Sequence, residues 1–338
     1  MAHDLTPPDP APVLDLLSAF RRSQVLFAAV ELGLFDTLAA GPRPLADLAA
    51  GLDADAAGRL VGACVSLGLL RHDGDRVSNT PAAQAYLTSD SSRRLLGYLT
   101  YSDRVLWKMW DHLPDAVRQG THRWKQTFDA DGPIFDSFYR TPEQKREFLL
   151  GMHGYGLISS PAVVNVVDLS GFRTLVDLGG ATGHLTHAAC RRWPRLRGVV
   201  FDLPAAVPLA REMVPPDLAD RVEVVAGDFF ADPLPAGDLY ALGRILHDWT
   251  EAKIHALLAK IAASLPAGGA VLIAEKLLHD DKAGPDWAVL QSLNMLVCTE
   301  GKERTLGEYE GLLSRHGFRD VRAVRTGTPC DAVLAVKG

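Results

Sequence analysis

The chain has 338 residues, of which 47% are hydrophobic and 22% charged, and its formal net charge is −6. This composition is typical of a globular protein of about two domains, and it lacks the basic excess of nucleic-acid-binding proteins. The four cysteines stand far apart with no C-x-x-C pair, so the sequence predicts neither a disulfide framework nor a zinc site.

The first hundred residues are predicted to form a mainly helical, winged-helix-like domain (1–100). Residues 13–40 carry apolar side chains three and four positions apart, which predicts a helix punctuated by Gly33 and Gly41. Two short helices follow over 44–51 and 53–70, the second with Asp53 or Asp55 as N-cap. A hairpin that turns at Asp73-Gly74 completes the unit.

A winged helix often binds DNA, but its charge argues against that here. Residues 45–80 contain three basic and five acidic side chains, which would repel phosphates. The sequence therefore predicts a dimerisation module with no nucleic-acid partner. The sequence has no N-terminal segment of basic residues followed by apolar ones and no uninterrupted apolar run of 18 residues. We therefore expect a cytoplasmic protein with no membrane partner.

The middle of the chain (101–165) is predicted to be a helical linker whose aromatic residues contribute to a flat substrate pocket. The stretch Gly151–Gly156 is expected to break or bend a helix there. Residues 166–338 alternate strands and helices, which predicts a parallel, doubly wound, Rossmann-like α/β domain. The expected strands cover 174–178, 198–203, 222–226, 238–242, 270–275, 321–325 and 332–336, and helices fit 251–264 and 306–316.

A glycine turn follows the first of these strands, in the sequence Asp177-Leu178-Gly179-Gly180-Ala181-Thr182-Gly183. Glycines there let the backbone approach a ligand closely, and the turn alone suits NAD, FAD or S-adenosylmethionine (SAM). The D-x-G-x-x-x-G spacing favours SAM, which has no pyrophosphate to cradle. Asp202-Leu203 ends the second strand with an acceptor for ribose hydroxyls, and Gly227-Asp228-Phe229-Phe230 follows the third with an acid and rings for an adenine.

A histidine follows the fourth strand, in Arg244-Ile245-Leu246-His247-Asp248-Trp249. Ligands of such sheets lie beyond the carboxyl ends of the strands, and an imidazole is suited to take a proton from a phenolic hydroxyl. Glu275, at the end of the fifth strand, and Glu303 are candidates to orient the ring. The alternative is a structural histidine with two surface acids.

With these motifs the chain resembles the small-molecule O-methyltransferases, a family that includes plant phenylpropanoid, bacterial polyketide-tailoring and animal acetylserotonin (hydroxyindole) enzymes. The resemblance is strongest to the acetylserotonin enzymes and rests on residues 23–33, 227–230, 246–249, 292–301 and 317–320. It implies His247 as general base flanked by Glu275 and Glu303, and a metal-free homodimer with intertwined N-terminal helices. It also implies cofactor contacts from Tyr139, Asp202, Gly227, Asp228, Phe229 and Arg244, and substrate contacts from Asp248 and Asn294.

Three positions depart from the family pattern. Ala181 stands where many relatives have glycine, Gly156 where the acetylserotonin enzyme has a cofactor-stacking tryptophan, and Cys298 where it has a glutamine that touches substrate. The predicted activity is SAM-dependent methylation of an aromatic hydroxyl, on a hydroxyindole such as N-acetylserotonin or on a polyketide phenol. The alternatives are carbon or nitrogen methylation, a SAM-binding relative without transfer, a nicotinamide oxidoreductase and a DNA-binding regulator.

Overall fold

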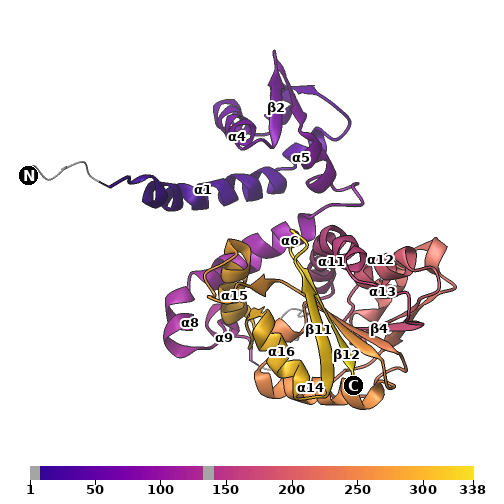
Figure 1. Cartoon of the computed structure of the whole chain (residues 1–338). Helices are drawn as coiled ribbons and strands as arrows, with labels where there is room; N and C mark the ends of the chain where they lie inside the picture. Colours follow the sequence, from indigo (N-terminus) through magenta and orange to yellow (C-terminus); the bar gives the residue numbers. More distant parts are fainter. Residues whose placement is uncertain (1–7, 132–140) are drawn as a thin grey trace, which may run out of the picture. The chain divides into compact units, whose positions relative to one another are not determined.

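The computed structural model describes residues 8–131 and 141–338, and the chain divides into two compact units, Met1–Thr100 and Tyr101–Gly338 (Figure 1). The aromatic-rich helices after residue 101 belong to the same unit as the strands that follow them. The three-domain division drawn from the sequence stays a prediction. No described helix is both long enough and apolar enough to cross a membrane.

The first unit is a helical layer against a small antiparallel sheet of order β1-β3-β2. Asp53 caps helix α4 as predicted, because the Asp53 Oδ1 accepts the Ala56 N–H at 2.8 Å. The hairpin pairs Asp73 with Arg76 around Gly74, whose φ is 60°. The elements are α1 (Ala11–Glu31), α2 (Leu34–Thr37), β1 (Arg43–Pro44), α3 (Leu45–Leu48), α4 (Ala54–Ser66), β2 (Leu70–Asp73), β3 (Arg76–Asn79) and α5 (Pro81–Tyr86).

The predicted helix over 13–40 is two helices, α1 and α2, separated where Gly33 adopts a φ of 68°. The carboxyl-terminal part of α1 packs into the core of this unit through Ala29, beside Phe35 of α2. Its amino-terminal part is different, because large apolar side chains there stay exposed: Val13, Leu14, Leu16, Leu17 and Phe20. An exposed apolar stripe of this kind marks an interaction surface.

The second unit begins with short helices and one long one. They are α6 (Leu96–Tyr101), which crosses from the first unit, η1 (Ser102–Leu106), α7 (Trp107–Trp110), α8 (Leu113–Gln119), α9 (Trp124–Phe128) and α11 (Pro142–Asn165). Of the break or bend expected over Gly151–Gly156, the break is wrong, because α11 runs unbroken through it. Gly156 instead lets α12 pack closely, since a Cβ there would lie 2.2 Å from the His184 ring. The histidine ring therefore occupies the space beside residue 156.

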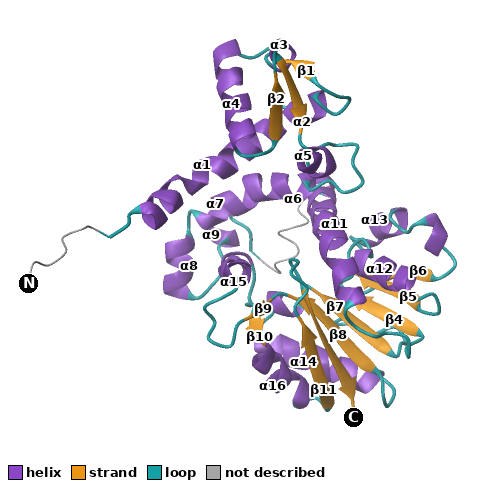
Figure 2. Ribbon diagram, turned by 45° about the horizontal axis from the view of Figure 1, so that its top comes forward, coloured by secondary structure: helices purple, strands orange, loops and turns teal. Residues whose placement is uncertain are grey.

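Within the described residues, seven strands form one sheet in the order β11-β12-β8-β7-β4-β5-β6 (Figure 2). Five consecutive strands, from β8 to the edge strand β6, are parallel, as predicted. They are β4 (Thr174–Leu178), β5 (Arg197–Asp202), β6 (Val222–Ala226), β7 (Leu239–Gly243) and β8 (Ala270–Glu275). All six residues of β8 are buried, as expected for a strand covered on both faces.

The sheet is not parallel throughout, which corrects the prediction. Strands β11 (Phe318–Val324) and β12 (Asp331–Lys337) form an antiparallel hairpin, and β12 also pairs antiparallel with β8. The segment between them is too short for the crossover that a parallel pair needs, so it can only turn back. A minor parallel pair joins β9 (Leu277–Leu278) to β10 (Arg304–Thr305).

Helices cover both faces of the large sheet. Helix α11 and α12 (His184–Arg192) share a buried apolar cluster with β4, β7, β8 and β12. Figures 1 and 2 place α14 (Glu251–Ser264) and α16 (Leu306–Ser314) on the opposite face. The remaining elements are α13 (Val207–Glu212), η2 (Pro216–Leu218), η3 (Leu246–Asp248) and α15 (Asp286–Cys298). The predicted α/β architecture is confirmed, and the carboxyl ends of its parallel strands converge on one edge.

Candidate active site

The glycine turn joins β4 to α12 in a conformation that few residues other than glycine adopt. Gly179 and Gly183 have φ angles of 67° and 79°. The Gly179 N–H donates to the Phe201 carbonyl oxygen at 2.8 Å, which ties the turn to β5. A Cβ on Gly179 would lie 2.5 Å from Ile245 Cδ1 and 3.4 Å from Phe229 Cε1. The turn therefore presents bare backbone beside an aromatic ring.

Ala181 is the departure inside this turn, and its φ is 49°. That left-handed conformation costs an alanine about 1–2 kcal/mol relative to glycine. The side chain packs against the cluster of Leu149, Ala206 and Leu209, and burying a methyl group returns about 0.8 kcal/mol. The packing of the partly buried side chain therefore offsets part of the conformational cost.

Asp177, in β4, packs against the backbone of the glycine turn. Its carboxylate is 2% exposed and accepts the Thr186 hydroxyl at 2.9 Å, which links the end of β4 to α12. A Cβ on Gly180 would lie 2.9 Å from the Asp177 carboxyl carbon, so the acid lies directly against the backbone of the turn. Burial raises the pKa of Asp177 to about 7. The hydrogen bond of this predicted cofactor residue is thus to α12, and it holds the turn in place.

Asp202 ends β5 beside the turn. Its Oδ2 accepts the Ala181 N–H and its Oδ1 accepts the Leu203 N–H, each at 2.7 Å. Because each carboxylate oxygen accepts two hydrogen bonds, one position on each remains for the vicinal hydroxyls of a ribose. Burial raises the pKa of Asp202 to about 6, although both N–H groups oppose the shift.

The segment after β6 brings an aromatic ring beside the glycine turn. Gly227 is required, since a Cβ there would lie 2.4 Å from Phe201 Cζ. The Oδ1 of Asp228 accepts the Phe230 N–H at 2.8 Å, which turns the chain so that Phe229 faces the glycine turn. The cradle of bare backbone, the buried acid and the ring fit a cofactor that carries an adenosine, such as the predicted SAM.

Arg244 lies between β7 and η3 with a φ of 60°, which is uncommon for a residue with a side chain. Its guanidinium lies 5.3 Å from the centre of the Tyr155 ring of α11. The backbone N–H of Arg244 donates to the Ala274 carbonyl oxygen at 3.1 Å, which joins the carboxyl ends of β7 and β8. The other predicted cofactor contact from the helices, Tyr139, lies outside the described residues.

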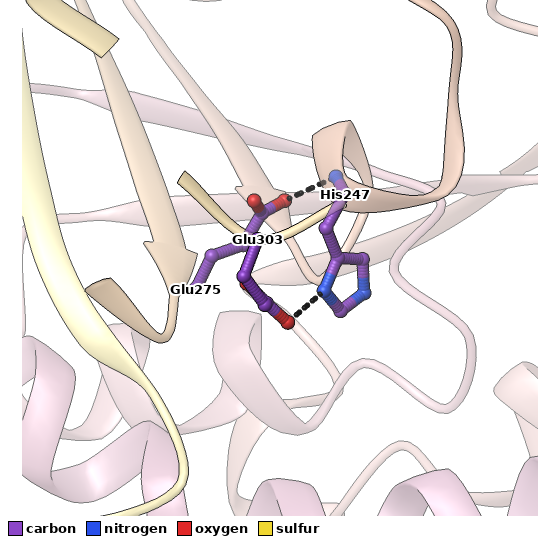
Figure 3. Close-up of side chains that lie close together, drawn as sticks. All are labelled: His247, Glu275 and Glu303. Carbon is purple, nitrogen blue, oxygen red and sulfur yellow. Dashed lines mark hydrogen bonds and ion pairs between the residues drawn. The ribbon is translucent and has the colours of Figure 1, made fainter. Parts of the chain in front are cut away.

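His247 and Glu303 form a buried pair beyond the carboxyl end of β7 (Figure 3). The ring Nδ1 lies 2.7 Å from Glu303 Oε1. When the ring is neutral, a carboxylate at that distance keeps the proton on Nδ1 and leaves the lone pair on Nε2 to accept a proton. Helix η3 places the ring, and β10 begins directly after Glu303. This pairing agrees with the sequence expectation that Glu303 orients the imidazole.

Glu275 lies beside this pair but bonds to the backbone rather than to the ring. Figure 3 shows its carboxylate directed at the His247 N–H. Its Oε1 accepts the N–H groups of Ile245, Leu246 and His247 at 3.0, 2.6 and 3.2 Å. Its other oxygen accepts the hydroxyl of Tyr309. Glu275 therefore fixes the loop that carries the histidine, and direct orientation of the ring belongs to Glu303.

Asp248 faces the other side of the ring, with its Oδ1 3.8 Å from His247 Nε2. Burial lowers the pKa of His247, but the charges of Glu303, Asp248 and Glu275 outweigh it and raise that pKa to about 9. Burial likewise raises the pKa of Asp248 to about 7. The Nε2 of His247 and the Asp248 carboxyl are thus two polar groups close together at the end of β7.

His247, Glu275 and Glu303 are also the one group among the described residues whose possible metal-ligand atoms lie within 4.8 Å of one another. Most of those atoms are already used. Glu275 accepts four hydrogen bonds and Glu303 Oε1 is paired with Nδ1. The arrangement is a hydrogen-bond network, and the expected absence of a metal stays a prediction.

The predicted substrate residues Asn294 and Cys298 lie one turn apart on α15, and both are buried. The end of α15 adjoins the histidine loop, since the Glu300 N–H donates to the Asp248 carbonyl oxygen at 3.1 Å. Sequence reasoning missed two partners, Tyr309 and Trp110. Each was indistinguishable from an ordinary apolar core residue, because only its side-chain hydrogen bond sets it apart.

A glycine turn, a buried acid and an aromatic ring lie beside a buried histidine–glutamate pair at the carboxyl edge of an α/β sheet. This is the arrangement of a group-transfer enzyme for small molecules. Residues 110–319 match the sequence model of the O-methyltransferase domain family, and residues 14–89 match that of the O-methyltransferase dimerisation domain family. The chain therefore belongs to the O-methyltransferase family.

Relatives match over the whole chain. Acetylserotonin O-methyltransferase of Bos taurus is 41% identical over 95% of both chains. The crystal structure of human N-acetylserotonin methyltransferase in complex with SAM superposes with a TM-score of 0.93, at 38% identity and 100% coverage of both chains. A Homo sapiens protein named as a probable bifunctional dTTP/UTP pyrophosphatase/methyltransferase is 40% identical, and the chain spans 55% of its length.

These matches confirm the family, the fold and the enzyme class that the sequence predicts. The dimerisation domain supports the predicted homodimer. The roles of the individual site residues are untested by any of them and stay predictions.

Proposed function

We propose that this protein transfers a methyl group from SAM to an aromatic hydroxyl of a hydroxyindole or a related phenol, with His247 as general base. The observation that carries the proposal is the buried His247–Glu303 pair beside the glycine cradle. The acetylserotonin relatives supply the substrate class. The four described cysteines are free and buried, which supports a reducing, cytoplasmic location.

The residues would hold the cofactor at three strand ends. Backbone of Gly179 and Gly180 would pass along its methionine portion, the Asp202 oxygens would accept its ribose hydroxyls, and Phe229 would cover its adenine. The same cofactor site would also include Leu203, Gly227, Asp228 and Arg244. Tyr139 is assigned to it from the family pattern. SAM supplies an electrophilic methyl group on a sulfonium sulfur.

The protein's own part in the reaction is to make the acceptor oxygen nucleophilic. His247 Nε2 takes the hydroxyl proton while Glu303 stabilises the positive charge that develops on the ring. The oxygen–carbon bond forms as the carbon–sulfur bond breaks, and S-adenosylhomocysteine leaves. Glu275 keeps the loop fixed through three backbone N–H groups, so the ring is held ready for attack.

The direct test is a methylation assay with SAM that carries a ¹³C-labelled methyl group, using 5-hydroxyindoles and simple phenols as acceptors. Mass spectrometry and the ¹³C shift of the product identify an O-methyl ether. We expect ethers from compounds with a free hydroxyl and none from the matched indoles without one. Label found on nitrogen or carbon would overturn the proposed reaction in favour of the alternative methyl transfers.

The exposed face of α1 is proposed to be the homodimer surface. Replacing Leu16 and Leu17, which are 75% and 70% exposed, with glutamate places two charges in that face. We expect the double variant to run as a monomer, measured by size-exclusion chromatography with light scattering, because buried charges oppose association. The exposed Gln24→Glu variant adds a single charge of the same sign outside this set and should remain dimeric. A dimeric double variant would contradict this assignment.

A further inference from the structure

Trp110, at the end of α7, donates its indole Nε1–H to Asn294 Oδ1 at 2.9 Å. An indole nitrogen can only donate a hydrogen bond. The atom of the Asn294 amide that faces Trp110 must therefore be its oxygen, and the NH₂ group must point away from the tryptophan. One contact thus fixes the polarity of a side chain whose two ends are otherwise similar in size.

A second donor acts on the same oxygen. Cys298 lies one turn further along α15, and its Sγ is 3.7 Å from Asn294 Oδ1. Burial raises the pKa of Cys298 well above its usual range, so the group stays a thiol and keeps its S–H. A thiol is a weak donor, and it reinforces the orientation that Trp110 sets.

The other end of the amide has no protein partner. Asn294 Nδ2 makes no hydrogen bond with any described residue, and the side chain is 9% exposed. The end of its helix is held at the site, because a Cβ on Gly301 would lie 2.3 Å from the His247 carbonyl oxygen. The backbone N–H of Arg123, just before α9, donates to the Val297 carbonyl oxygen at 2.9 Å, and the indole N–H of Trp124 donates to the Cys298 carbonyl oxygen at 2.8 Å.

We propose that Trp110 is a positioning residue that makes Asn294 an obligate donor, and that the enzyme therefore selects aromatic hydroxyl compounds that also carry a carbonyl acceptor. This inference rests on the proposed function. A substrate carbonyl accepts one N–H of the amide, whereas an alkyl group of equal size leaves that N–H without a partner. The loss of a partner, rather than a clash, is the source of the selection.

The test compares two neutral ligands, N-acetylserotonin and the 5-hydroxy-3-alkylindole of equal chain length without the amide. Their dissociation constants are measured by calorimetry on the full chain with S-adenosylhomocysteine bound, so that no turnover occurs. We expect the wild-type protein to prefer the carbonyl ligand by roughly tenfold or more. Trp110→Phe should lose most of that preference through weaker binding of the carbonyl ligand, with the alkyl ligand unchanged.

Controls separate this role from a structural one. Trp193→Phe removes an indole N–H that has no partner among the described residues, and it should keep the preference. Asn294→Asp leaves an oxygen for Trp110 but replaces the NH₂ with a second oxygen, so the preference should disappear even if Trp110→Phe folds poorly. Equal binding of both ligands by the wild-type protein, or an unchanged preference in Trp110→Phe, would overturn the inference.

The same pair of ligands distinguishes this inference from the proposed function. If the wild-type protein with SAM methylates both hydroxyls at similar kcat/KM, the proposed function stands and the carbonyl selection is wrong. If it binds the carbonyl ligand selectively but methylates neither hydroxyl, the proposed function fails while the role of Trp110 holds.

Discussion

His247→Ala is expected to lower kcat by roughly 10²–10⁴-fold, the usual contribution of a general base. His247 is 3% exposed and its Nδ1 lies 2.7 Å from Glu303 Oε1, so the substitution removes the whole imidazole–carboxylate pair. Binding of SAM, measured by calorimetry, should be unchanged within about twofold, because the cradle is built by other strand ends. The rate is measured by mass spectrometry of the methylated product.

Two further results sharpen that experiment. His255→Ala removes a half-buried histidine of α14 that pairs with His316, and it should leave kcat unchanged. If His247→Ala retained full kcat, the histidine would not be the base, and proton loss to solvent or to Asp248 would take its place. A loss of SAM binding in parallel with kcat would instead identify a structural role.

Glu303→Gln should move the pH dependence of kcat/KM to lower pH. The wild-type value should rise with pH through about 9, because His247 accepts a proton only once its ring is neutral. Removing the Glu303 charge lowers the pKa of the imidazole, so the rise should occur roughly one to two pH units earlier. The plateau should fall roughly 10²-fold, since the variant no longer stabilises the charged ring.

The control for the pH profile is Glu310→Gln, which removes an exposed acid from α16 and should not move the rise. Asp248 faces the same ring at 3.8 Å, so the observed midpoint belongs to the coupled groups together. An unchanged midpoint in Glu303→Gln would show that this carboxylate does not set the charge of His247. That result would remove the electrostatic basis of the proposed mechanism.

The partners of the acids were the part of the site that the sequence left open. Glu275 and Glu303 both stood as candidates to orient the ring, yet only Glu303 reaches it and Glu275 accepts backbone N–H groups. Asp177 is predicted as a cofactor residue, which stays a prediction, and its carboxylate also joins β4 to α12 through Thr186. A buried carboxylate bonds to whichever donors packing brings near it, and no local pattern specifies those donors.

Glycine was another limit of the sequence. The glycines of α11 suggested a broken helix, because glycine disfavours helix where it stands alone in solvent. In the structure they are buried, and one of them, Gly156, allows the His184 ring of α12 to approach. The same residue type has the opposite meaning in the turn after β4, where positive φ angles require it. Only the neighbouring element decides between these two meanings.

The sequence by itself determined that the glycine turn, Asp202, Phe229 and His247 would meet. Each follows a strand of an alternating α/β pattern, and the carboxyl ends of parallel strands share one edge of the sheet. Only the tertiary structure decided that β12 pairs antiparallel with β8, that Tyr309 hydrogen-bonds Glu275 and that Trp110 hydrogen-bonds Asn294. Trp110 and Asn294 stand 184 positions apart. Such long-range hydrogen bonds follow from packing of distant elements, whereas strand ends follow from local periodicity.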